Sequence, residues 1–193
     1  MEEWQAKQIW KMLTKFGCKV VLDAGCGDGI LGKFKPNGTT VYGIDIDKEK
    51  IKIAKRYEIA KEGDIQNLPY ESSFFDAVVC FHVIEHVENP QQAIDEFERV
   101  LKPNGILVIE TPTPWSPNAW NDPTHLRAYT KEDILLLIIN RFDVIETKYT
   151  GRGIPLLGVL RLYKISSTIG DFLADRFGIR KNHVFVVCRK VFA

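Results

Sequence analysis

The sequence is poor in cysteine and has almost no net charge. Only four of its 193 residues are cysteine, and they lie far apart without a Cys-x-x-Cys pair, so neither a disulfide framework nor a zinc ribbon is expected. The 26 Lys and Arg residues balance 25 Asp and Glu residues, and neither sign forms a long run. This balance does not favour a surface that binds nucleic acid, so no nucleic-acid partner is expected.

Long apolar runs are also missing. The longest strictly apolar run, Ile134–Ile139, is far shorter than the roughly 20 residues of a membrane span. Glu2 and Glu3 stand where a secretory signal would be basic. We therefore expect a cytoplasmic protein without a membrane span.

Patterns of buried strands and helices alternate along the chain. Short apolar runs indicate buried parallel strands at residues 19–22, 40–44, 77–81 and 106–110. Helical patterns begin near Gly29 and cover residues 48–57, 89–102 and 131–140. Residues 144–149 and 184–189 are expected to close the sheet as an antiparallel pair. The alternation predicts an α/β fold: a Rossmann-like, doubly wound, mostly parallel sheet with helices on both faces.

We predict a single domain, 1–193, with four parts. Residues 1–18 form a covering helix, 19–149 the ligand-binding core, 150–182 a lid-like insertion, and 183–193 the closing strand. Within the core, residues 111–123 contain four prolines and are expected to form an irregular loop. Ligands of such sheets bind outside the carboxyl ends of the strands, which is where we place the site.

A glycine-rich turn follows the first strand in the stretch VVLDAGCGDGILG. Gly25 and Gly27 allow a sharp turn and the close approach of a ligand. The stretch also contains a G-x-G-x-x-G pattern, which is typical of dinucleotide binding and leaves an NAD-dependent oxidoreductase as an alternative. However, the carboxylates of Asp23 and Asp28 would repel a pyrophosphate. A cationic ligand without phosphate fits this turn better.

Further acids follow at the expected spacing. Asp45 ends the second strand roughly 20 residues after the glycines, where an acid accepts hydrogen bonds from ribose hydroxyls. Asp64 precedes the strand at 77–81 and is a candidate to receive an adenine amino group, with Ile46 and Ile65 flanking the ring. Alternatively, Asp45 or Asp47 only caps a helix, and Asp64 is a turn residue.

Three motifs then occur in order over residues 19–112: DAGCGDG, YGIDIDKEKIKIA, and GDIQNLPYESSFFDAVVCFHVIEHVENPQQAIDEFERVLKPNGILVIETP. Together they resemble the class I S-adenosylmethionine-dependent methyltransferases, in particular the small-molecule branch related to quinone-biosynthesis methylases. The resemblance implies a seven-stranded sheet with its last strand antiparallel, and S-adenosyl-L-methionine as the cofactor. It also implies cofactor contacts by Asp23, Gly25, Cys26, Gly27, Asp45, Ile46, Asp64, Ile65, Phe81 and His82.

The chemistry implied is in-line transfer of the sulfonium methyl group to a small, partly apolar acceptor. Because this methyl group is already activated, the protein mainly has to align the acceptor and exclude water. If the acceptor loses a proton, His125 is the first candidate for the base and His82 the second. Trp115, Trp120 and Tyr129 are expected to cover the substrate.

Other readings remain open from the sequence. His82, Glu85 and His86 lack a supporting carboxylate cluster in the sequence, so no metal site is expected. A non-catalytic cofactor-binding or scaffold protein would share the same motifs. The apolar residues of 150–182 also suit a homodimer contact.

Overall fold

In the computed structural model, which describes residues 1–150 and 182–191, seven strands form one sheet in the order β3-β2-β1-β4-β5-β7-β6. The strands are β1 (Val20–Ala24), β2 (Thr40–Asp45), β3 (Ile59–Glu62), β4 (Phe75–Phe81), β5 (Leu101–Pro112), β6 (Phe142–Thr150) and β7 (His183–Lys190). The pairs among β3, β2, β1, β4 and β5 are parallel, whereas β7 runs antiparallel to both β5 and β6. The predicted mostly parallel sheet with an antiparallel last strand is confirmed.

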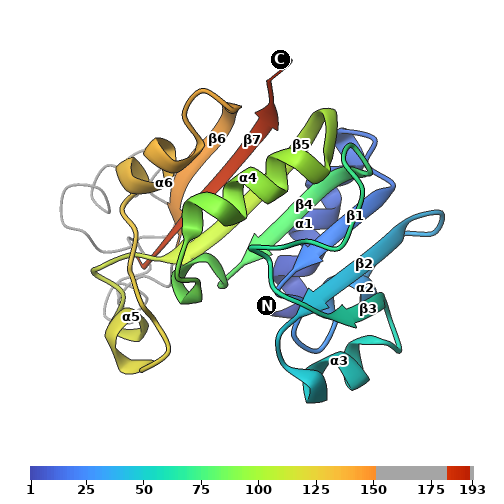
Figure 1. Cartoon of the computed structure of the whole chain (residues 1–193), viewed down its shortest axis with the longest axis horizontal. Coiled ribbons are helices and arrows are strands. Elements are labelled where there is room, and N and C mark those ends of the chain that lie inside the picture. The colour runs from blue at the N-terminus through green and yellow to red at the C-terminus, as the bar shows by residue number, and fades with distance from the viewer. Residues whose placement is uncertain (151–181, 192–193) are drawn as a thin grey trace, which may run out of the picture.

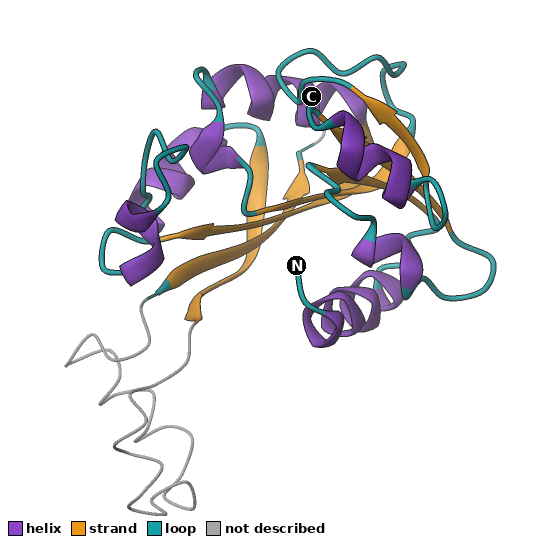
Figure 2. Cartoon of the chain, turned by 90° about the horizontal axis from the view of Figure 1, so that it is seen from below, coloured by secondary structure: helices purple, strands orange, loops and turns teal. Residues whose placement is uncertain are grey.

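Helices cover both faces of the sheet (Figures 1 and 2). They are α1 (Glu3–Lys15), α2 (Ile30–Lys33), α3 (Lys48–Ala54), the short 3-10 helix η1 (Ile84–His86), α4 (Pro90–Val100), α5 (Pro117–Asn121) and α6 (Lys131–Ile138). On one face, α4 and α6 pack on the sheet through Ile94, Phe97 and Ile134. On the other, α1 packs through Ile9, Trp10 and Leu13. Strand residues of alternating parity fill the two cores, as a sheet buried on both faces requires.

Capping residues stand at the first turns of three helices, at the positions predicted from the sequence. Asp47 caps α3 by accepting hydrogen bonds from the N–H groups of Glu49 and Lys50, and Asn89 caps α4 with Pro90 at its first position. The predicted capping box of Thr130 and Asp133 opens α6. These caps satisfy N–H groups that have no partner within the helix.

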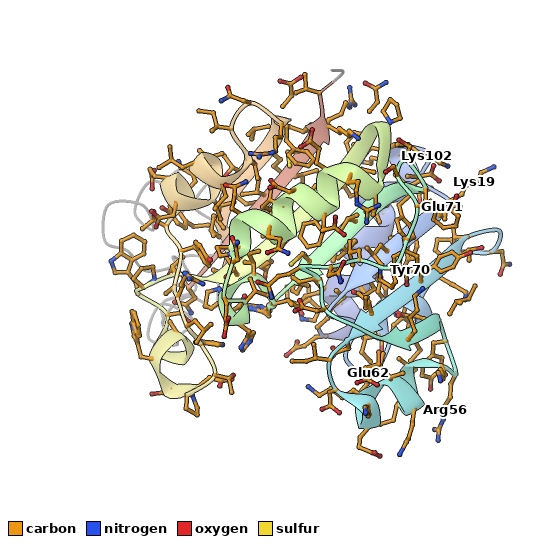
Figure 3. The ribbon with its side chains drawn as sticks, in the orientation of Figure 1. Lys19, Arg56, Glu62, Tyr70, Glu71 and Lys102 are labelled. Atoms are coloured by element: carbon orange, nitrogen blue, oxygen red, sulfur yellow. The ribbon has the colours of Figure 1, made fainter. Side chains whose placement is uncertain are left out.

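The parallel strands begin at one side of the sheet and end, at their carboxyl ends, at the opposite side. Figure 3 shows Lys19 and Lys102 together near the edge where β1 and β5 begin, and Glu62, the last residue of β3, near the opposite edge. There the parallel strands end, and β7, because it is reversed, begins. The first residue of β7 therefore lies at the carboxyl ends of the parallel strands. The residues that follow β1, β2, β4 and β5 lie on this same side.

The structure corrects several predicted boundaries. The edge strand β3 was not predicted, because its pattern is mostly exposed and polar. The predicted irregular loop at 111–123 contains the short helix α5, and β5 runs into its first residues. The predicted helix at 48–57 ends at Ala54.

Residues 151–181 lie outside the part that the structure describes. The predicted insertion at 150–182 and the homodimer contact assigned to it fall almost wholly there. No helix within 1–150 or 182–191 combines the length and the apolar character needed to cross a bilayer.

Candidate functional site

The glycine turn after β1 adopts a backbone that only glycine accepts easily. Gly25 has φ +79° and Gly27 φ +51°, both in the left-handed region. A Cβ at Gly25 would overlap the side chain of Val83, whereas a Cβ at Gly27 would have no protein atom within 4 Å. Gly27 therefore borders open space.

Asp45 is tied directly to this turn. Its Oδ2 accepts a hydrogen bond from the Gly27 N–H at 2.8 Å, and its Oδ1 accepts one from the Asp47 N–H at 2.9 Å. Because a carboxylate has about four acceptor sites, capacity remains for ribose hydroxyls. The neighbouring Ile46 is 75% exposed and free to contact a ligand.

The other predicted adenine contacts lie after β3. Oδ1 of Asp64 accepts a hydrogen bond from the Gln66 N–H at 2.8 Å, which is the predicted turn role, and the Asp64 side chain remains exposed. Ile65 is buried and packs in the main core. Its contact with a ligand stays a prediction.

A pair of buried carboxyl groups lies beneath the glycine turn. Burial and the charge of Glu58 raise the pKa of Asp23 well above its usual value. Burial also raises the pKa of Glu58 to about 7, although its hydrogen bond from the Gly32 N–H at 2.7 Å acts in the opposite direction. The thiol of Cys26 is buried against the same pair, and its pKa is raised by burial and by Asp23. Both carboxyl groups beneath the turn therefore bind a proton more readily than exposed acids do.

His82 directly follows β4 and has a left-handed φ of +56°. Its N–H donates to the carbonyl oxygen of Glu110, and its ring lies between two carboxylates: Nδ1 is 3.4 Å from Oε1 of Glu85, and Nε2 is 3.5 Å from Oε1 of Glu110. Burial acts to lower the pKa of His82, but hydrogen bonding and charge from Glu110 and Glu85 raise it to about 9. Without other ligands, His82 is therefore protonated at neutral pH.

A pocket of about 1600 Å³ opens beside His82. Its walls come from α1, from the ends of β4 and β5, from β6 and from the start of β7. Phe81, His82 and His125 line it, but the glycine turn and Asp45 do not. The geometry thus separates a turn with acids, on β1 and β2, from a larger chamber rich in histidine and glutamate.

His125 reaches this chamber from the loop after α5. Its Nδ1 lies 3.0 Å from the carbonyl oxygen of Ala119, and its ring centroid is 4.6 Å from that of His86. Because the carbonyl accepts the Nδ1 hydrogen, Nε2 is left as the basic nitrogen. It is 3.8 Å from Oδ2 of Asp122.

The predicted substrate lid is not assembled as one surface. Trp115 and Trp120 are exposed; Trp115 stacks edge-on against Tyr149, and Nε1 of Trp120 donates to the Pro114 carbonyl at 3.0 Å. Neither tryptophan lines the pocket. Tyr129 is buried in the main core, where its hydroxyl donates to the Ile84 carbonyl at 3.4 Å. A core position of this kind does not suit a lid residue.

Comparisons with known proteins agree with this geometry. A family model described as "Methyltransferase domain" matches residues 22–109. Over 113 residues, the chain is 33% identical to a ubiquinone biosynthesis O-methyltransferase of Coxiella burnetii, in an alignment that covers 54% of this chain and 48% of that protein. Residues 22–109 of the chain are thus similar to a methyltransferase domain.

Solved structures share the fold of this methyltransferase domain. An S-adenosylmethionine-dependent methyltransferase from Archaeoglobus fulgidus superposes with a TM-score of 0.72 at 22% identity, covering 96% of this chain and 94% of that one. A geranyl diphosphate methyltransferase in complex with S-adenosylmethionine superposes with a TM-score of 0.70 at 16% identity, covering 98% and 86%. The domain class recognised from the sequence is confirmed, with S-adenosylmethionine as the cofactor of that class. The chain spans about half the length of the curated relatives it matches.

Several residues of the methyltransferase domain were missed in the sequence. Glu110 ends an apolar strand run just as Asp23 and Asp45 do, so the same rule would have found it. His183 gave no local signal, because its place depends on the reversed pairing of β7 with β5. Glu58 also gave no local signal, because it is distant in sequence from the glycine turn and reaches it only in the folded chain.

Proposed function

We propose that this chain binds S-adenosylmethionine at the carboxyl edge of its sheet and transfers the methyl group to a small, partly apolar acceptor in the adjoining pocket. The observation that carries the proposal is the hydrogen bond from Gly27 to Asp45, which couples the glycine turn to an acid suited to ribose. The Asp45 carboxylate beside the turn favours a cationic cofactor over a diphosphate.

The acceptor is proposed to present a hydroxyl group. The similar Coxiella protein is named an O-methyltransferase, and the pocket here combines titratable histidines with apolar side chains such as Phe81 and Phe185. A hydroxyl must lose its proton as its oxygen attacks the methyl carbon. The bond from sulfur to the methyl group breaks as the bond from oxygen to it forms, and S-adenosylhomocysteine leaves.

We assign proton removal to His125. Its Nδ1 is held by a backbone carbonyl, so Nε2 is the free acceptor within the pocket. His82 is less suited to this role, since its two carboxylate neighbours keep it protonated at neutral pH. In the absence of other ligands, its positive charge would instead stabilise the acceptor anion.

Titration calorimetry tests cofactor binding. S-adenosylhomocysteine should bind the wild-type protein, and Asp45→Asn should weaken binding at least tenfold, because one ionised acceptor is lost. Asp28→Asn is the matched control: it removes the same charge from an exposed position in the same turn and should change the affinity less than threefold. Tight binding of NAD with no heat from S-adenosylhomocysteine would contradict the proposal.

Turnover tests the transfer itself. Incubation with labelled S-adenosylmethionine and a set of small phenols should release S-adenosylhomocysteine, detected by mass spectrometry. His125→Gln should lower kcat by roughly 10²-fold or more, the usual contribution of a general base, while leaving cofactor affinity unchanged. A non-catalytic scaffold would bind the cofactor without turnover and would tolerate this substitution.

A further inference from the structure

Three side chains with metal-binding atoms converge where β4, β5 and β7 meet. His82 follows β4, Glu110 lies near the end of β5, and His183 begins β7. One ligand atom from each lies within 4.8 Å of the others. The two imidazole rings are 4.8 Å apart, centroid to centroid, at 78° to one another. The group therefore brings two nitrogen donors and one oxygen donor around one point.

A fourth residue, Glu85, contacts the ring nitrogen of His82 that does not face Glu110. Oε1 of Glu85 lies 3.4 Å from Nδ1 of His82, and within the described residues this buried oxygen has no hydrogen bond of regular geometry. Its Oε2 accepts a hydrogen bond from the Thr111 hydroxyl at 3.0 Å, which fixes the carboxylate. A histidine that binds a metal through one nitrogen commonly donates its other N–H to such a carboxylate. Glu85 is placed to orient His82 in this way.

The charges at this point are unbalanced. The side chain of Glu85 is fully buried, Glu110 is 5% exposed, and His82 lies between them. Besides His82 and His183, Gln5 approaches Glu110, with its Nε2 3.5 Å from Oε1. Burying two carboxylates is costly unless positive charge compensates both. A divalent cation compensates both.

We propose that His82, Glu110 and His183 bind a divalent transition-metal ion such as Zn²⁺, with Glu85 as the positioning residue. Two imidazoles and one carboxylate are a donor set found in three-ligand zinc sites, which keep a further position open. All three proposed ligands line the pocket, so the open position faces the acceptor chamber. This deepens the proposed function, on which it rests: an acceptor hydroxyl would occupy that position and lose its proton more easily when bound to the ion.

A neighbouring cluster provides the alternative location. Ligand atoms of Glu85, His86 and His125 also lie within 4.8 Å of one another. A metal ion there would bind Glu85 but have no contact with Glu110, whereas an ion at the proposed site binds Glu110 directly and is linked to Glu85 through His82. For this reason we favour the site built from His82, Glu110 and His183.

The test measures Zn²⁺ alone, with untagged protein stripped by a chelator and without cofactor or acceptor. Calorimetry should show one ion bound per chain. His183→Gln should weaken Zn²⁺ binding at least tenfold, and Glu85→Gln should weaken it about 10- to 100-fold, as is usual when a second-shell partner is lost. His125→Gln, the matched histidine in the other cluster, should keep the wild-type affinity.

Two further measurements make the outcome unambiguous. S-adenosylhomocysteine affinity and the circular dichroism spectrum of His183→Gln should match the wild type, which shows that the variant is folded. X-ray absorption of the zinc-loaded protein should show two imidazole ligands. Absence of Zn²⁺ binding by the wild type, or its loss in His125→Gln but not in His183→Gln, would overturn the metal site while leaving the proposed function standing. Zinc binding without cofactor binding would support the metal site and contradict the proposed function.

Discussion

Replacing Glu58 by glutamine should flatten the pH dependence of stability. In the native protein Glu58 is buried beside Asp23, and its pKa is raised from 4.5 to about 7. The native state therefore retains a proton that the unfolded chain has already released above pH 4.5, so the free energy of unfolding falls as the pH rises from about 4.5 to 8. At 1.36 kcal/mol per pH unit, a pKa of about 7 in place of 4.5 corresponds to ~3 kcal/mol. The raised pKa of Asp23 acts in the same direction.

Glutamine preserves the contacts of this residue. Its oxygen can still accept the hydrogen bond from the Gly32 N–H, and its amide can donate to the Asp23 carboxylate. Urea unfolding followed by circular dichroism at pH 5, 6, 7 and 8 measures the effect. Wild type should lose stability over this range, and Glu58→Gln should lose less than half as much. Glu71→Gln, an exposed control that Figure 3 labels, should follow the wild type. An equally steep loss in Glu58→Gln would refute the raised pKa of Glu58.

Three further substitutions, in the glycine turn, at the start of the sheet and in the core, are tested by denaturant unfolding. Gly25→Ala should cost about 3 kcal/mol, because it combines a left-handed φ with overlap on Val83; Val83→Ala in the same chain should recover the packing part only. Asp76→Asn should cost about 1–2 kcal/mol at pH 7. Although burial acts to raise the pKa of Asp76, hydrogen bonds from Lys102 and the strand backbone lower it, so the cost should disappear as the pH falls below the usual aspartate range. Phe97→Ala should cost about 4 kcal/mol, since this fully buried ring would leave a cavity beneath α4; a cost below about 1 kcal/mol would contradict the described core.

Much of the cofactor half could be predicted because its signals are local. Parallel strands end at one edge, so an acid that follows a buried strand must lie near the glycine turn, and Asp45 does. The capping box of Thr130 and Asp133 lies within one helical turn and was visible for the same reason. Such features need no knowledge of how distant segments pair.

The acceptor half depends on pairings that the sequence does not encode locally. His183 reaches His82 only because β7 is inserted, reversed, between β5 and β6. The edge strand β3 lacks the apolar run that buried strands show, so its lone buried residue, Ala60, gave no periodic signal. Tyr129 was assigned to a lid from its loop position, but burial in the core cannot be read from one aromatic residue.

The reversal of β7 has a consequence for how this architecture can vary. Thr150 ends β6 and Asn182 precedes β7; the Asn182 N–H donates to the Thr150 carbonyl at 3.1 Å, and both residues line the pocket. The two residues that flank this connection are thus joined by a hydrogen bond and lie at the pocket. Since each doubling of a connection costs only about 0.6 kcal/mol in closure entropy, this stretch can be exchanged or lengthened without shifting the register of any strand. The lining of the pocket beside Thr150 and Asn182 can therefore vary while the glycine turn and Asp45 stay as they are.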